Sequence, residues 1–212
     1  MDRGTYRNGI LGPFNGKVGI VVGYELRGQY VMRDVGKKRT ERPPSPAELA
    51  SRKKFADVQF WLQPLTDFLR VGFKDYAPKF EGFVAAKSYI SKNAVRGEYP
   101  SFVIEPALAL VSFGKLDPAI TAGAVSESTN TLTFSWDGGR YVYDDRAMFL
   151  VYDIENGVAE FDTSATKRLF KKGKFTLTKN FSGREVHVYL AFVSEDRKNR
   201  SNSQYLGKVT VL

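Results

Sequence analysis

The second half of the chain constrains the fold most. From Ser101 onward, short apolar runs alternate with turn residues, and no helical pattern separates them. Runs at this spacing are typical of an antiparallel Greek-key β-sandwich of the immunoglobulin or fibronectin type. We expect strands near residues 102–112, 131–136, 147–152, 158–162, 174–178, 186–194 and 204–211. The turns between them carry Asp117-Pro118, Asp137-Gly138-Gly139, Glu155-Asn156-Gly157, Lys172-Gly173 and Ser182-Gly183.

One expected strand shows the alternation of a sheet with a buried face. Four apolar residues take alternate positions in residues 186–193: Val186, Val188, Leu190 and Phe192. The positions between them are His187, Tyr189, Ala191 and Val193. A period of two places the first set on one face of the strand. Trp136 is the expected central core aromatic, and burying its ring contributes on the order of 2–3 kcal/mol.

The first hundred residues predict a hairpin and a linker before two helices. Strand-type residues in 17–35, interrupted at Arg27-Gly28, are typical of a hairpin. Residues 37–44 are basic and end in two prolines, which favours an extended linker.

The helical signals begin at Ser45, a good N-cap residue. Pro46 suits the first helical position, and Glu48 completes a capping box. The expected apolar stripe of this helix is Phe55, Val58, Leu62, Leu65 and Leu69. Pro64 should kink it, because proline removes a backbone hydrogen bond. A second helix is expected over residues 81–95, with Phe83, Ala86, Ile90 and Ala94 on one side and Gly97 as its stop signal.

These patterns predict a mainly β chain with a helical N-terminal part. We expect residues 1–100 to hold the hairpin, linker and helices. The β-sandwich domain is expected over residues 101–212.

The sequence lacks the patterns of common catalytic and metal sites. It has no cysteine, which excludes disulfides, thiolate metal sites and a cysteine nucleophile. His187 is the one histidine, and no nucleophile elbow accompanies it. Gly12 and Gly16-Lys17-Val18 have three residues between the glycines, where a phosphate loop needs four, and valine replaces its Ser/Thr.

Acidic residues gather at Asp144-Asp145 and at Asp153 with Glu155. They lack the spacing of a calcium loop and fall where turns are expected, so solvated turns are the favoured interpretation. We therefore expect no catalytic site, cofactor or metal.

Positive charge is concentrated in the N-terminal quarter. The chain carries a net charge of +9, and residues 1–54 hold 12 Lys/Arg against 5 Asp/Glu. The cluster consists of Arg27, Arg33, Lys37, Lys38, Arg39, Arg42, Arg52, Lys53 and Lys54. Tyr24 and Tyr30 lie nearby and could stack on bases, so polyanion or nucleic-acid binding is one hypothesis. A soluble charged linker beside a solvated helix start is the favoured alternative.

Motifs near both ends resemble a known family. At the start these are residues 8–12, 16–19, 22–23 and 31–33, then Arg52 with Lys54-Phe55. Residues 97–100 match in the middle, and residues 187–194, 201–203 and 205–207 match at the end. Together they are similar to a large family of uncharacterised proteins from Bacteroidetes, over nearly the whole chain. The sequence departs from it at Glu105-Pro106 and at Glu48. The resemblance implies lineage and shape but no activity.

The function expected from the sequence is that of a non-catalytic interaction or structural protein. Its partner would be an unknown protein or a second copy of the chain, since sandwich modules commonly carry binding loops. Carbohydrate binding through Tyr141 and Tyr143 is a further alternative. No secretory signal or membrane span is seen, so a cytoplasmic location is the default expectation.

Overall fold

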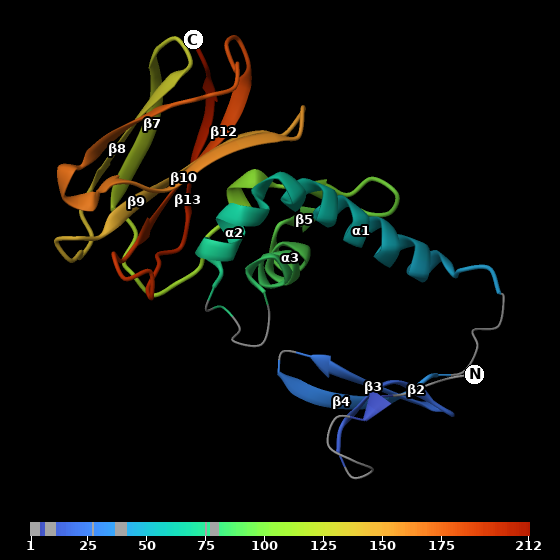
Figure 1. Ribbon diagram of the computed structural model, residues 1–212. Coiled ribbons are helices and arrows are strands. Elements are labelled where there is room, and N and C mark those ends of the chain that lie inside the picture. Colours follow the sequence, from blue (N-terminus) through green and yellow to red (C-terminus); the bar gives the residue numbers. More distant parts are fainter. Residues whose placement is uncertain (1–4, 7–11, 27, 37–41, 75, 77–80) are drawn as a thin grey trace. The chain divides into compact units, whose positions relative to one another are not determined.

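The computed structural model describes residues 5–6, 12–26, 28–36, 42–74, 76 and 81–212. Contacts divide the chain into two units, Met1–Pro44 and Ser45–Leu212. The boundary expected at residue 100 falls inside the second unit. Figure 1 labels the elements of both.

The first unit is a four-stranded antiparallel sheet in the order β1-β2-β3-β4. Its strands are β1 (Thr5–Tyr6), β2 (Phe14–Val18), β3 (Val21–Leu26) and β4 (Gln29–Asp34). The predicted hairpin is present as β3 and β4, but Gly19 and Ile20 form a turn rather than strand. Gly23 is the one buried residue within 12–26, 28–36 and 42–44, and the Phe14 ring packs against it.

The second unit begins with three helices. They are α1 (Pro46–Leu62), α2 (Thr66–Gly72) and α3 (Gly82–Asn93). The predicted capping box is confirmed: Ser45 Oγ accepts a hydrogen bond from the Glu48 N–H at 3.3 Å, and a Glu48 carboxylate oxygen accepts one from the Ser45 N–H at 2.8 Å. At Pro64 the α-helix gives way to the 3-10 turn Gln63–Leu65, because proline cannot donate the next helical hydrogen bond.

The helix faces are largely those predicted. Val58, Leu62, Leu65 and Leu69 are buried, but Phe55 is 56% exposed, so its place in the stripe was wrong. The predicted α3 positions Ala86, Ile90 and Ala94 are buried, and Phe83 is partly buried. The helix ends at Asn93, because the chain continues as β5 (Val95–Arg96) before Gly97.

Two antiparallel sheets follow in the second unit, one of four strands (β10-β9-β12-β13) and one of three (β11-β8-β7). Their strands are β7 (Thr121–Ser128), β8 (Thr131–Asp137), β9 (Arg146–Asp153), β10 (Val158–Lys167), β11 (Lys172–Thr176), β12 (Glu185–Val193) and β13 (Gln204–Thr210). The strand expected over 102–112 is reduced to β6 (Val103–Ile104), which pairs with β5, and Pro106 opens a 3-10 turn after it. Strand β7 was not expected.

The two sheets share one apolar core. Phe134 of β8 stacks on Phe149 of β9, with ring centroids 4.0 Å apart. Trp136 is 4% exposed and meets Phe192 of β12 edge-on, so the predicted core aromatic is confirmed. The even-numbered apolar positions of β12, from Val186 to Phe192, all belong to this core.

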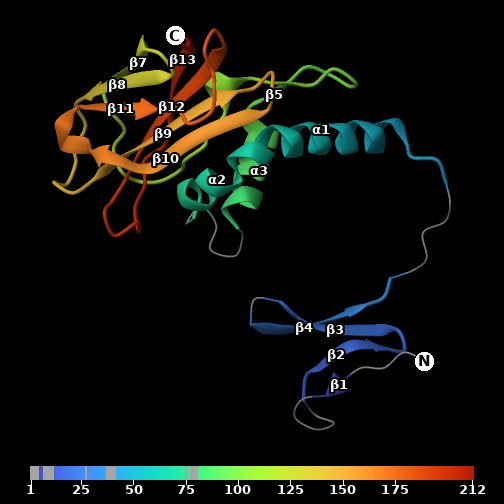
Figure 2. The same ribbon diagram turned by 45° about the horizontal axis from the view of Figure 1, so that its top comes forward.

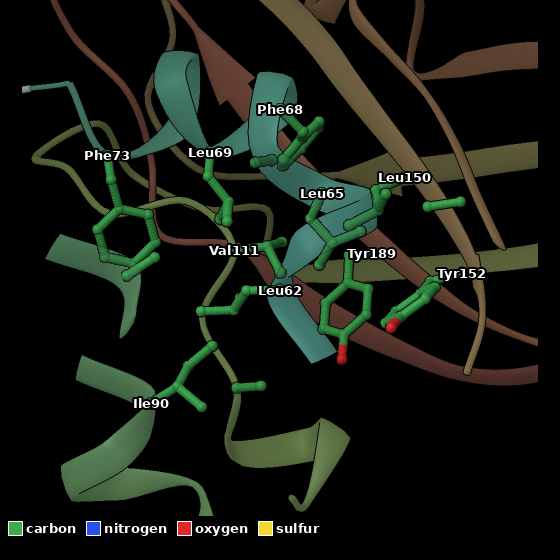
Figure 3. Close-up of a cluster of buried hydrophobic side chains, with 14 of the residues drawn as sticks. Leu62, Leu65, Phe68, Leu69, Phe73, Ile90, Val111, Leu150, Tyr152 and Tyr189 are labelled. Atoms are coloured by element: carbon green, nitrogen blue, oxygen red, sulfur yellow. The ribbon is translucent and has the colours of Figure 1, made fainter. Parts of the chain in front are cut away.

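The opposite face of the four-stranded sheet is covered by the helices. Figure 3 shows Leu150, Tyr152 and Tyr189 of β9 and β12 beside the α1 and α2 side chains. The Tyr152 hydroxyl donates to the Trp61 carbonyl at 2.8 Å, and the Tyr189 hydroxyl donates to the Pro106 carbonyl at 2.9 Å. The central strands β9 and β12 are therefore buried on both faces. The fold is mixed α/β with mostly antiparallel strands in several sheets.

No helix within the described residues is both long and apolar enough to cross a membrane.

Candidate functional site

Four connections meet at one end of the two sheets of the second unit. Arg146, at the start of β9, pairs with both Val193 and Lys167, the last residues of β12 and β10. In the other sheet, Thr121 pairs with Asp137, so β7 begins where β8 ends. Residues 114–120, 138–145, 168–171 and 194–203 therefore leave the sheets together. We call these four segments the loop end. In Figures 1 and 2 the loop end lies at the end of the sheets opposite the C-terminus.

Arg168 ties three of these segments together. It is 1% exposed, and its guanidinium donates to the carbonyls of Asp117 (2.7 Å), Pro118 (3.2 Å) and Gly138 (3.2 Å). The guanidinium carbon lies 3.9 Å from the Phe192 ring centroid. Burial lowers the pKa of this guanidinium, and the nearby carboxylates of Asp145 and Asp117 oppose that shift.

The backbone of Arg168 continues the network. Its carbonyl accepts the Trp136 indole N–H at 2.8 Å, and its own N–H donates to the Asp145 carbonyl at 2.7 Å. The loop end is thus fixed to the core between the sheets by one buried side chain and its peptide groups. Ordered loops lose less entropy on binding than mobile ones.

Large apolar side chains are exposed on the loop end. Their exposed fractions range from 41% to 79%. They are Ile120, Tyr141, Val142, Tyr143 and Phe170. Apolar and aromatic side chains gathered on ordered loops are typical of binding surfaces rather than of inert surface.

Two adjoining hollows open on the loop end, and Tyr141 and Val142 line the second of them. One, of about 240 Å³, is lined by Phe113, Lys115 and Lys198 among others. The second, of about 290 Å³, is lined by Lys115, Arg140, Tyr141 and Asp145 among others. Lys115 lines both, so the hollows are neighbours.

Some charged groups of the loop end are paired and others are not. Lys171 lies 2.8 Å from Asp137, and this hydrogen bond lowers the pKa of Asp137. Lys167 lies 2.6 Å from Asp144, whose hydrogen bond raises the pKa of Lys167. Within the part of the chain that the structure describes, Lys115 and Arg140 make no ion pair.

The predicted basic cluster is divided between the two units and residues outside the described ranges. Arg27, Lys37, Lys38 and Arg39 lie outside the described residues. Arg33 and Arg42 belong to the first unit, whereas Arg52, Lys53 and Lys54 lie on α1 of the second. The Arg33 guanidinium carbon lies 5.7 Å from the Tyr24 ring centroid, and Lys53 pairs with Asp57 at 2.5 Å.

His187 meets a hydroxyl group but no carboxylate. Its Nδ1 lies 2.8 Å from the Tyr205 hydroxyl, and no carboxylate of the described residues hydrogen-bonds to its ring. Burial, followed by the charge of Lys208, lowers the pKa of His187. The side chain is half-buried on the face of β12 that also carries Tyr189.

The acidic residues considered for calcium are used in turns. An Asp153 carboxylate oxygen accepts from the Asn156 N–H at 3.0 Å, and Arg184 pairs with the same carboxylate at 3.2 Å. Asp145 Oδ2 accepts from the Val142 N–H at 2.9 Å. Over the described ranges, no three metal-ligating side chains form a group.

Reasoning from sequence missed the loop end as a unit. Tyr141 and Tyr143 were considered for sugar stacking, and the structure places both there, on the connection between β8 and β9. In the sequence Arg168 lies in a basic run with Lys167, Lys171, Lys172 and Lys174, a pattern typical of an edge strand or hairpin loop. The available signal is Trp136, because a buried indole N–H usually finds an acceptor, although the buried Trp61 N–H has none among the described residues.

Comparison with known proteins identifies a family. Residues 13–207 match the model of a family described as a family of unknown function, DUF6266. No curated protein and no solved structure matches the chain.

Proposed function

We propose that this chain, which belongs to the DUF6266 family of unknown function, is a non-catalytic binding protein that uses its loop end. The resemblance found in the sequence is thereby confirmed over nearly the whole chain as far as the family is concerned. A Bacteroidetes origin is part of the proposal and rests on the sequence motifs alone.

The observation that carries the proposal is the exposure of Tyr143 and Phe170. Both side chains are 63% exposed. Phe170 lies on the same segment as Arg168, and Tyr143 lies on the segment whose Gly138 carbonyl accepts a hydrogen bond from Arg168. Tyrosine and phenylalanine are enriched where proteins bind partners, because they bury a large area with few rotatable bonds. Exposed aromatic side chains lower the solubility of a protein, and a binding role explains why these two are exposed.

We also propose that the two sheets form a fibronectin-type sandwich. The strand order supports this: β7-β8-β11 corresponds to strands A, B and E of that fold, and β10-β9-β12-β13 to C′, C, F and G. In such sandwiches the connections at one end commonly carry the binding residues. The connections before β9, before β11 and after β12 would be the equivalent loops here.

Site-specific photo-crosslinking in the native host tests the binding role even while the partner is unidentified. A benzophenone side chain placed at Tyr143 or at Phe170 should give an adduct of defined mass. The matched control is Phe60 of α1, which is 71% exposed but lies on a helix. Adducts from Phe60 alone, or from none of the three positions, would contradict the proposal.

Polyanion binding through the N-terminal quarter is a second candidate. The stacked pair of Arg33 and Tyr24 on neighbouring strands favours it, since aromatic and guanidinium groups together support base stacking. Fluorescence polarisation with labelled single-stranded DNA should show binding that weakens between 50 and 200 mM salt, by roughly tenfold or more if several phosphates are contacted. Binding that salt leaves unchanged would reject this candidate.

A further inference from the structure

We infer that the loop end binds an acidic carbohydrate, with the sugar carboxylate at Lys115 and Arg140. The inference rests on the proposed binding role of the loop end and adds the chemical class of the ligand. It draws on the size of the two hollows, the groups that line them and their charge.

The size of the two hollows fits small rings that are linked one after another. At about 240 and 290 Å³ they lie below or at the lower end of the roughly 300–1,000 Å³ typical of sites for drug-sized molecules. Because Lys115 lines both, one chain of linked rings can pass from one to the other. Two neighbouring sugars of an oligosaccharide have this arrangement.

The second hollow combines an aromatic face with hydroxyl acceptors. The Tyr141 ring is 41% exposed, and the Arg168 guanidinium lies 5.6 Å from its centroid, which orients the ring. Asp145, 1% exposed, lines the same hollow and uses one oxygen to accept the Val142 N–H. A carboxylate has further acceptor sites, so Asp145 can receive a sugar hydroxyl while Tyr141 packs on the ring.

The charge of the hollow selects an acidic sugar over a neutral one. The hollow also holds the carboxylates of Asp117, which accepts the Arg140 backbone N–H at 3.3 Å, and of Asp145, and both carboxylates interact electrostatically with the buried Arg168. Lys115 and Arg140, both exposed, have no carboxylate partner for their side chains within the described residues. A guanidinium binds a planar carboxylate through two parallel hydrogen bonds, which a sugar hydroxyl cannot reproduce.

The neighbouring cations of the first hollow already have partners. Lys198 of the first hollow lies 3.6 Å from Asp196. The Arg200 guanidinium donates to the carbonyls of Lys198 and Arg197. The cations available to a carboxylate are therefore Lys115, which lines both hollows, and Arg140, which lines the second.

Isothermal titration of the full chain with tetragalacturonate tests the inference, with cellotetraose as the neutral counterpart. We expect tetragalacturonate to bind and cellotetraose to bind at least about tenfold more weakly, the difference of a charge-assisted pair. Arg140→Gln and Tyr141→Ala should each weaken tetragalacturonate binding about tenfold or more. Lys92→Gln, an exposed substitution on α3, should leave it unchanged.

Each contrary outcome has a distinct meaning. Equal affinity for both oligosaccharides, or binding that Arg140→Gln does not weaken, overturns the assignment of the carboxylate. No binding of either probe overturns the carbohydrate inference. In both cases crosslinks from Tyr143 and Phe170 would still support a binding loop end, so the two proposals fail separately. Thermal melting of each variant shows whether lost binding reflects lost folding.

Discussion

Arg168 shows how one buried charge can organise a surface made of loops. Its guanidinium replaces water with three backbone carbonyls from segments that are far apart in sequence, and it also packs against Phe192. Among the described residues the two terminal nitrogens of Arg168 are hydrogen-bonded, while its buried Nε has no partner. Burying a charge is costly unless its donors are paired, so the loops are held where their carbonyls point inward. The chemistry of one residue thereby fixes the geometry of the loop end.

Replacing Arg168 should therefore destabilise the second unit strongly. Arg168→Met removes three charged hydrogen bonds and leaves their carbonyls unpaired, so we expect a loss of about 3–5 kcal/mol. Urea denaturation followed by tryptophan fluorescence measures it. Lys171→Met is the control: Lys171 is exposed and paired with Asp137, and its loss should cost less than about 1 kcal/mol. Equal effects of the two changes would show that Arg168 is not the organising residue.

Tyr152 gives the second prediction at this scale, on pH dependence. Burial, with a contribution from Asp153, raises the pKa of Tyr152 to about 12. Its unfolded pKa is about 10, so its contribution to stability is complete below pH 10 and is lost as the pH rises towards 12. Between pH 9 and 11.5 the wild-type chain should lose about 2 kcal/mol more than Tyr152→Phe does. Urea unfolding at the two pH values measures this, and parallel losses in both proteins would contradict it.

At the scale of elements, β9 and β12 join the helices to the two-sheet core. Residues of β12 that point to one side, such as Val188, belong to the core between the sheets, and Ala191 on the other side packs towards the helices. In the sequence, central strands that are covered on both faces are continuous apolar runs. The helices are therefore a layer of the fold.

A charge on the helix-facing side of β12 should unfold the whole unit. Ala191→Asp places a carboxylate at a position that is 1% exposed, and the penalty should exceed about 3 kcal/mol. Far-ultraviolet circular dichroism should show the helix and strand signals lost together. Val125→Asp on β7, where the side chain is 53% exposed, is the matched control and should change stability by less than about 1 kcal/mol. Loss of the helix signal alone in Ala191→Asp would mean that the layers fold independently.

Local signals predicted the elements that depend on neighbouring residues. The capping box at Ser45, the break at Pro64 and the alternation in β12 each follow from chemistry within a few positions. Strand β7 was missed because its residues, such as Ala122, Gly123 and Ala124, are small and carry no apolar alternation. The buried second face of β12 depends on where α1 and α2 pack, which no local pattern encodes.

The loop end, which we propose as a binding surface, was harder to predict than the strands that carry it. The loop end joins four segments between residues 114 and 203, and only the strand register places them together. Tyr141 and Tyr143 could be singled out by residue type. Lys115 and Arg140 could not, because an isolated basic residue in a turn gives no pattern.

At the scale of the whole molecule, the two units differ in how much they bury. Val18, Tyr30 and Met32 of the first unit are 40–69% exposed, and its described side chains form no core. The second unit contains both apolar cores. A small sheet without a buried face is marginal in water.

Separating the units tests this difference. A chain of residues 45–212 should unfold cooperatively at nearly the midpoint of the full chain, since its contacts are internal. A peptide of residues 1–44 should show no cooperative thermal transition by circular dichroism. A folded 1–44 peptide, or a 45–212 chain without a transition, would contradict the division of stability between the units.

Because β9 and β12 are buried on both faces, their amide hydrogens should be the last to exchange with deuterium. The amide hydrogens of these strands are bonded to neighbours on both edges and shielded above and below, so they exchange only when the entire unit opens. Their exchange rates therefore report the global free energy of unfolding directly. The edge strands of the three-stranded sheet, β7 and β11, open with smaller fluctuations and should exchange earlier than β9 and β12.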